Sequence, residues 1–279
     1  MTDTQTFYRQ VIDVNGIETA YLEAGSAHAP PVVLLHDGAF GSDAQSCWSP
    51  VIPELSADFR VLVPDLLGYG GTRKLVAFDR DPMTQRLDHV RGFCAALGLD
   101  LPFFVGSSFG GGMVLRGAAS GALPMKAGIT IAGTGGLFMN LEQFSLLQNY
   151  EATSEWSRAV CEVMVGDLVT DDMVETRLAR SKAPGHYEVL AAPSLVAPVV
   201  PASAGDWHPA YQAALSKIDV PILLIEGGDD TLFQTGWAAE MAKFMPTARP
   251  VVIAGTRHLP HVQKPHEVAQ VIREFLQRG

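Results

Sequence analysis

The clearest candidate for a catalytic residue in this sequence is a serine, Ser108, that lies between two glycines. The pentapeptide Gly106–Gly110 has the pattern Gly-x-Ser-x-Gly, and it joins an apolar run, Phe103–Val105, to a helix-compatible run, Met113–Ala119. This order predicts a nucleophile elbow, in which Ser108 is held on a sharp turn between a strand and a helix. Side chains at the two glycines would crowd the neighbouring strand and helix. The same residues also fit an ordinary turn with Ser108 as a helix cap, so other groups must decide.

A base is the next requirement, because a serine hydroxyl is a poor nucleophile on its own and histidine usually activates it. His258 follows the last expected strand, Pro250–Ile253. Loops at the carboxyl ends of parallel strands are where open α/β sheets build their sites. His261 and His266 follow closely as rivals, although His266 falls in the last expected helix. We therefore favour His258 as the base.

A carboxylate must then orient the imidazole through its other nitrogen. The apolar run Val220–Ile225 leads into a loop that contains Asp229 and Asp230, so both aspartates are candidates. Glycine and aspartate also form ordinary turns, which is the simpler explanation of this loop. The spacing alone does not separate the two aspartates.

Stabilisation of an oxyanion needs backbone N–H groups aimed at the developing charge. Phe109, the residue after the candidate nucleophile, would supply one of them. The other should come from the loop after the third strand, which is His36–Gly41 and contains glycine. A simple turn would have the same composition.

The elements that must position these residues alternate between strand and helix. A hairpin is expected around Asn15–Gly16, between Phe7–Val14 and Ile17–Glu23. Short apolar runs typical of buried strands lie at Pro31–His36, Arg60–Pro64, Pro102–Val105, Ala127–Ile131, Val220–Ile225 and Pro250–Ile253. Helical periodicity lies at Ser49–Leu55, Met83–Leu97, Thr235–Phe244 and Pro265–Gln277. This alternation predicts an α/β fold with a mainly parallel sheet.

The alternation stops after residues 132–136, and the next segment is helix-like. Helices are expected at Leu141–Tyr150, Glu155–Val165 and Thr170–Ser181, and Ala191–Pro209 is rich in proline and typical of a loop. We therefore expect a core made of residues 1–135 and 210–279, with a helical cap over residues 136–209.

Taken together, these motifs resemble the α/β-hydrolase fold superfamily over nearly the whole chain. Residues 36–38 are similar to its His-Gly oxyanion motif, residues 65–72 to its Asp-x-x-Gly-x-Gly loop, and residues 258–265 to its C-terminal histidine motif. Residues 227–230 resemble its Gly-x-x-Asp motif, which selects Asp230 over Asp229. The resemblance implies an eight-stranded sheet with helices on both faces, a Ser108–His258–Asp230 triad, and an oxyanion hole formed by Gly38 and Phe109.

One residue of the oxyanion motif departs from this pattern. Asp37 stands where the superfamily usually has glycine. Aspartate tolerates unusual backbone angles, so the loop can still form. A carboxylate beside the hole would, however, disfavour an anion.

The nucleophile type narrows the chemistry that the resemblance implies. Members of the fold that act on haloalkanes and epoxides use an aspartate at the elbow, whereas Ser108 indicates acyl transfer through an acyl-enzyme. We expect a serine hydrolase whose substrate is a small carboxylic ester or lactone. The same fold also hosts ligand receptors with idle triads and cofactor-free oxygenases, and an intact triad disfavours both.

The cap supports an alternative substrate. Residues 166–177 resemble the cap of hydrolases that cleave meta-cleavage products at a carbon–carbon bond, and Arg177 would match their carboxylate-binding arginine. A surface arginine on an amphipathic helix is the plain alternative. Ser107, Pro50 and Leu259 replace residues that are usually asparagine, asparagine and tryptophan there. We therefore assign Arg177, Ser107 and Leu259 to substrate binding and keep carbon–carbon cleavage as the alternative.

Composition excludes several other classes. The net charge of −10 argues against binding to a nucleic-acid backbone. The three cysteines have no spacing that suggests a disulfide framework or a metal site. Residues 1–10 do not resemble a signal peptide, and no apolar run is long enough to span a membrane. We expect a cytoplasmic enzyme with a small-molecule substrate, no cofactor, and no nucleic-acid or membrane partner; a homodimer remains open.

Overall fold

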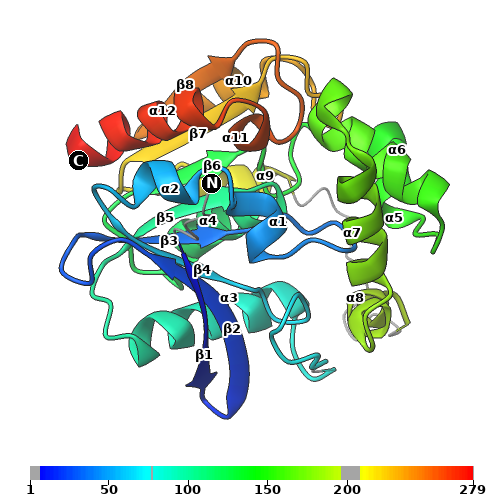
Figure 1. The fold of residues 1–279 in the computed structure, drawn as a ribbon. Coiled ribbons are helices and arrows are strands. Elements are labelled where there is room, and N and C mark those ends of the chain that lie inside the picture. Colours follow the sequence, from blue (N-terminus) through cyan, green and yellow to red (C-terminus); the bar gives the residue numbers. More distant parts are fainter. Residues whose placement is uncertain (1–6, 77, 196–207, 279) are drawn as a thin grey trace, which may run out of the picture.

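An eight-stranded sheet with helices on both faces forms the centre of the computed structural model, which describes residues 7–76, 78–195 and 208–278 (Figure 1). The strands are β1 (Tyr8–Val14), β2 (Ile17–Ala24), β3 (Pro31–Leu35), β4 (Arg60–Pro64), β5 (Phe103–Ser107), β6 (Gly128–Ile131), β7 (Ile222–Gly227) and β8 (Ala248–Ile253). Their order is β1-β2-β4-β3-β5-β6-β7-β8. The pairs β1–β2 and β2–β4 are antiparallel, and all the others are parallel. The expected fold class is confirmed.

The first hairpin turns where the sequence predicts. Val14 pairs with Ile17, and Asn15 and Gly16 between them have φ of 54° and 83°. Positive φ at both central residues matches the right-handed twist of the flanking strands, which explains the choice of Asn-Gly.

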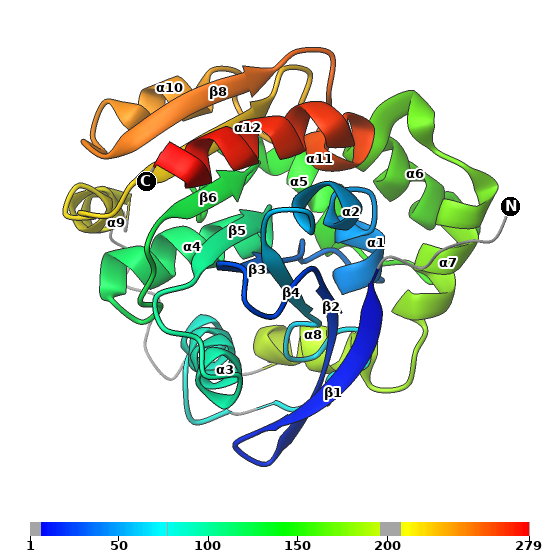
Figure 2. The same ribbon diagram turned by 60° about the vertical axis from the view of Figure 1, so that its left-hand side comes forward.

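Alternate residues of the central strands are buried on opposite faces of the sheet. Val32 and Leu34 of β3 pack in one apolar cluster with α1 (Ala44–Trp48), α2 (Ile52–Leu55) and α12 (Pro265–Arg278). Val33 and Leu35 pack in another with α3 (Pro82–Ala96) and α4 (Phe109–Ser120). Figure 2 shows these two helical layers with the sheet between them. The remaining core helices are α10 (Trp237–Ala242) and α11 (Pro260–Gln263).

The helix expected over Ser49–Leu55 is shorter in the structure, because only α2, Ile52–Leu55, lies in this range, and the sequence analysis did not predict α1, Ala44–Trp48, before it. The Asp43 side chain accepts the Ser46 N–H at 2.7 Å and starts α1 before the predicted boundary. Pro50 lacks the N–H needed to continue α1, so the chain turns before α2 begins.

Several helices lie between β6 and β7 in the chain: α5 (Leu141–Gln148), α6 (Ser154–Val165), the 3₁₀ turn η1 (Gly166–Leu168), α7 (Asp171–Ser181), α8 (His186–Leu195) and α9 (His208–Leu215). Figure 1 shows α5 to α8 grouped at one end of the sheet. The loop expected over residues 191–209 is wrong at both ends, because α8 continues to Leu195 and α9 begins at His208. Residues 196–207 lie outside the described part of the chain, and the core–cap boundaries stay a prediction. No helix in the described ranges is long and apolar enough to cross a bilayer.

Candidate active site

The elbow around Ser108 is a strained turn that only glycine neighbours allow. Ser108 has φ 51° and ψ −112°, and its N–H donates to the carbonyl of Ile131 at 2.7 Å. A Cβ on Gly106 would lie 2.1 Å from the carbonyl oxygen of Gly110, and one on Gly110 would lie 2.3 Å from that of Leu35. The crowding predicted for the two glycines is therefore present, from the helix for one and from a neighbouring strand for the other.

A continuous hydrogen-bonded chain joins Ser108, His258 and Asp230. The His258 Nε2 lies 2.8 Å from Ser108 Oγ, and its Nδ1 lies 2.8 Å from Asp230 Oδ2. The other oxygen of Asp230 accepts the Leu232 N–H at 2.9 Å, which fixes the carboxylate. With Nδ1–H donating to the carboxylate, Nε2 can accept the serine proton. The His258 side chain has no exposed surface, so water does not compete for these bonds.

The rival residues lie elsewhere. Asp229 is exposed beside Asp230 and does not contact the imidazole. His261 is buried against the Trp48 ring at 4.5 Å, where burial lowers its pKa to about 3. His266 is exposed and lies 2.9 Å from a carboxylate oxygen of Glu54. Within the described ranges, no group of three or more His, Cys, Asp or Glu could hold a metal ion.

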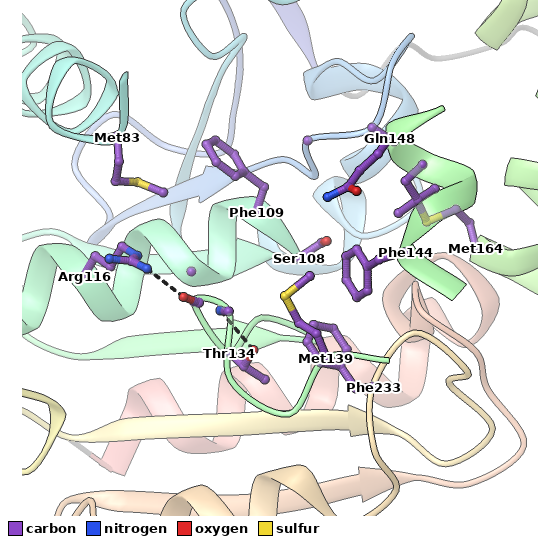
Figure 3. A pocket seen from close by; sticks show the side chains of 16 residues that line it. Met83, Ser108, Phe109, Arg116, Thr134, Met139, Phe144, Gln148, Met164 and Phe233 are labelled. Atoms are coloured by element: carbon purple, nitrogen blue, oxygen red, sulfur yellow. Dashed lines mark hydrogen bonds between the residues drawn. The ribbon is translucent and has the colours of Figure 1, made fainter. Parts of the chain in front are cut away.

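Ser108 opens onto a cavity of about 320 Å³ with mostly apolar walls. Figure 3 shows Met139, Phe144 and Phe233 close to the serine. The Phe233 ring stacks on the imidazole of His258, with centroids 5.7 Å apart and an interplanar angle of 18°. Sequence reasoning missed Phe233, although it comes three residues after Asp230 and so had to lie near the site.

The two predicted oxyanion donors line the same cavity. A Cβ on Gly38 would lie 2.8 Å from the Cβ of Phe109, so the two residues are in close contact. Within the described ranges neither backbone N–H has an acceptor. The carbonyl of Gly38 accepts the Tyr69 hydroxyl at 2.9 Å, which helps to orient the peptide. These two N–H groups can therefore donate to an oxygen of a bound substrate.

Arg177 and Leu259 line a second cavity, of about 330 Å³, rather than the one that contains Ser108. Met164 lines both cavities, so they are neighbours. The Arg177 side chain donates from Nη1 to the carbonyl of Phe40 at 3.0 Å. Ser107, the last residue of β5, is fully buried and lines neither cavity. Two of the three predicted substrate-binding residues therefore line the cavity next to Ser108's, whereas Ser107, the chain neighbour of Ser108, lines neither cavity.

The helices inserted before β7 contact the loops that carry the site. His186 of α8 accepts the N–H of Gly41 at 3.0 Å and donates to the carbonyl of Gly68 at 3.2 Å. Burial lowers the pKa of His186 to about 4, which keeps it neutral and able to accept. The Leu259 N–H donates to the carbonyl of Met164 in α6 at 2.9 Å. No motif in the sequence marks these contacts.

Comparison with known proteins identifies the family of this chain. Residues 32–271 match the model of the alpha/beta hydrolase family. The chain belongs to this family. The hydrolase is 25% identical over 278 residues to 2-hydroxy-6-oxo-6-(2'-aminophenyl)hexa-2,4-dienoic acid hydrolase of Metapseudomonas resinovorans, which covers 98% of this chain and 92% of the relative. It is 26% identical over 268 residues to 2-hydroxymuconate semialdehyde hydrolase of Pseudomonas sp. strain CF600, which covers 94% and 91%.

Solved structures show the same fold. A meta-cleavage product hydrolase mutant superposes with a TM-score of 0.83 at 23% identity, over 97% of this hydrolase and 98% of that chain. A carboxylesterase from Bacillus subtilis superposes with a TM-score of 0.77 at 16% identity, over 98% and 92%. Hydrolases named for different bonds therefore share this fold, and the fold alone does not identify the bond that is cleaved.

Proposed function

We propose that this hydrolase cleaves a carbon–carbon bond beside the ketone of a dienone acid, with Ser108 as nucleophile, His258 as base and Asp230 as its orienting partner. The curated relatives above carry the names of hydrolases of dienoic acids and of a muconate semialdehyde. These names favour the alternative expectation from the sequence, carbon–carbon cleavage, over the main expectation, which was an ester or lactone.

The observation that carries the proposal is the pair of cavities on either side of Met164. The first is mostly apolar and contains Ser108 with the two oxyanion donors. The second is lined by the cations Arg177 and Arg180, together with Asp172 and several hydroxyl groups. A dienone acid has the same polarity, because an apolar acyl group lies at one end and a carboxylate at the other. Guanidinium groups bind carboxylates well, so the acid end would lie in the second cavity.

The reaction begins at the ketone. Ser108 Oγ attacks the carbonyl carbon while its proton passes to Nε2 of His258, and Asp230 stabilises the imidazolium. The N–H groups of Gly38 and Phe109 donate to the new oxyanion. These steps are the same for an ester and for a ketone.

Collapse of the tetrahedral intermediate breaks the bond between the carbonyl carbon and its neighbour. The carbon can leave only from the 2-oxo tautomer of the substrate, which forms before the attack when the 2-hydroxyl loses a proton and the carbon beside the ketone gains one. The electron pair of the broken bond is then delocalised through the remaining double bond onto the 2-oxo group. The imidazolium returns its proton to the departing fragment. Water, activated by the same imidazole, then hydrolyses the acyl-enzyme and releases the second acid.

An ester or lactone substrate is the second candidate. Leu259 lines the second cavity where the carbon–carbon hydrolases usually have tryptophan, and Ser107 lines neither cavity. The polar groups that those hydrolases place around the acid end are therefore altered here. A neutral ester would need only the serine, the base and the oxyanion donors.

A substrate panel tests the proposal. The purified hydrolase is given 2-hydroxy-6-oxo-6-phenylhexa-2,4-dienoate, p-nitrophenyl butyrate and an aliphatic lactone, with Ser108→Ala as the matched control. We expect the dienone absorbance to decay with the highest kcat/KM and Ser108→Ala to be inactive on all three.

Two outcomes would contradict the proposal. Turnover of the ester or lactone with an inert dienone acid would restore the main expectation of the sequence. If nothing is cleaved, a bound dienone acid would indicate a receptor, and oxygen consumption would indicate an oxygenase.

A further inference from the structure

Asp37 is a buried carboxylate of the oxyanion loop itself, and the proposed mechanism gives it no role. Its exposed fraction is 1%, and it lines neither cavity, so it does not touch substrate. Burial opposes the charge of Asp37, but Arg177, the Ser42 hydroxyl, His36 and the Ala39 N–H together hold its pKa below the ordinary value. A buried charge without partners costs several kcal/mol, so these contacts are what allow an aspartate at this position.

The carboxylate closes the loop around Gly38. One oxygen of Asp37 accepts the N–H of Ala39 at 3.0 Å, and the other accepts the hydroxyl of Ser42 at 2.7 Å. Both donors follow Gly38 in the same loop, so the carboxylate fixes the backbone on the far side of the oxyanion donor. Because Gly38 is in close contact with Phe109, any shift of the loop changes the distance between the two donors.

The positive charge beside Asp37 comes from the inserted helices. Arg177 belongs to α7, donates to the carbonyl of Phe40 at 3.0 Å, and its backbone oxygen would lie 2.3 Å from a Cβ on Gly41. The helix is therefore in direct contact with the loop that Asp37 shapes. Removing Arg177 would take away one of the groups that compensate this buried anion, close to the place where a second anion forms during the reaction.

We propose that Asp37 is a positioning residue that holds the Gly38 N–H in the oxyanion hole, and that Arg177 supports the same loop from the inserted helices through its contacts with Phe40 and Gly41. The aspartate at the usual glycine position thus organises the hole instead of repelling the oxyanion. This inference rests on one part of the proposed function, the tetrahedral oxyanion that forms when Ser108 attacks. It does not depend on which bond is cleaved.

Asp37→Asn tests the positioning role, because asparagine keeps the shape but replaces one acceptor with a donor. With p-nitrophenyl butyrate we expect kcat to fall about 10- to 100-fold with little change in KM. Complete loss of an oxyanion donor costs more than this, and Asp37→Asn only misplaces the donor. Phenylboronic acid, which forms a tetrahedral adduct with serine, should bind more weakly by a similar factor. Butyrate binding to Ser108→Ala should be the same with and without Asp37→Asn, a pattern that a loss of folded protein would not produce.

Asp43→Asn is the matched control. Asp43 also belongs to this loop region and pairs with α7, through Arg180 at 2.9 Å, but it lies further along the chain from Gly38. We expect boronate affinity and ester kcat to stay within about twofold of the original protein. If Asp37→Asn also leaves both quantities unchanged, or if Asp43→Asn lowers them equally, the positioning role is wrong.

A double variant tests the part played by Arg177. Arg177→Met alone should lower kcat on the neutral ester, because it leaves Asp37 buried without its cation. Adding Asp37→Asn to Arg177→Met should lower kcat by a smaller factor than Asp37→Asn does in the original protein, because the charge that Arg177 helps to compensate is gone. Additive losses in the double variant, or an effect of Arg177→Met confined to KM for the dienone acid, would contradict the coupling.

These tests are separate from the test of the proposed function. If the dienone acid is not cleaved, the proposed bond cleavage is wrong, but the ester and boronate results still test the role of Asp37.

Discussion

The three loops that carry Ser108, Asp230 and His258 differ from the oxyanion loop in what holds them in place. The triad loops follow β5, β7 and β8, and backbone contacts hold them: Gly106 is crowded against Gly110 in the elbow, and the Leu259 N–H next to His258 donates to the carbonyl of Met164. The oxyanion loop is held by side chains, namely its own Asp37 together with Tyr69 and His186 from distant elements.

This difference indicates how each part of the site would respond to change. A loop fixed by backbone packing has little freedom, so a substitution there either fits or disrupts the fold. A loop held by separate hydrogen bonds can lose one of them and still form, with a cost of about 1 kcal/mol for each. Catalysis requires both kinds of loop to meet at one cavity.

The largest expected effect is on the triad itself. Asp230→Asn should lower kcat roughly 10³- to 10⁴-fold, because the imidazole loses its orienting partner and adopts the wrong tautomer. The thermal midpoint should change little, since the side chain keeps its size. Rates on the most active substrate of the panel measure the loss, and circular dichroism checks the fold.

Asp229→Asn is the control for this prediction, because Asp229 is the exposed neighbour. Its rate should stay within about twofold of the original. A large loss in Asp229→Asn together with a normal rate in Asp230→Asn would reverse the assignment and show that sheet packing does not fix this loop as described.

Gly106→Ala should destabilise the fold by about 3 kcal/mol or more, because its Cβ would lie 2.1 Å from backbone that cannot move. Gly121→Ala provides the comparison, since Gly121 has φ 70° and nothing within 4 Å of the added Cβ. That variant should lose only about 1 kcal/mol, from its left-handed backbone. Urea unfolding measures both, and equal losses would mean that backbone crowding does not hold the elbow.

The smallest expected effect is a pH dependence in the oxyanion loop. Because the pKa of His186 is lowered to about 4 in the folded protein, the unfolded chain binds a proton first as the pH falls below about 6.5. The contribution of neutral His186 to the free energy of unfolding is therefore complete above that pH and is lost toward pH 4. His89, with its pKa at about 4, and His261, at about 3, act in the same direction.

His186→Gln should remove the share of this dependence that belongs to the oxyanion loop, about 1 kcal/mol between pH 6.5 and 5. Urea midpoints of both proteins across this range provide the measurement. Parallel curves for the two proteins would show that His186 is not a neutral acceptor in the folded state. The oxyanion loop would then not depend on this side chain as described.

Sequence patterns located most of the fold because they are local. The strand Arg60–Pro64 was predicted with the bounds that the structure has, since a short apolar run buried on both faces has few alternatives. The helix expected over Ser49–Leu55 begins only at Ile52, and α1 before it was not predicted, because the Asp43 cap and the break at Pro50 are not part of the apolar periodicity. The proline-rich segment after residue 190 looked like a loop, yet α8 continues to Leu195.

The sequence by itself determined the elbow and the chain order of serine, aspartate and histidine, because these depend on turns next to strands and on residues that are neighbours in the chain. Only the tertiary structure decided that Asp37 turns into its own loop, that Arg177 lines a second cavity, and that Phe233 covers the imidazole. Arg177 and its acceptor Phe40 are 137 residues apart. Contacts across such separations depend on how whole layers pack, and no local spacing records them.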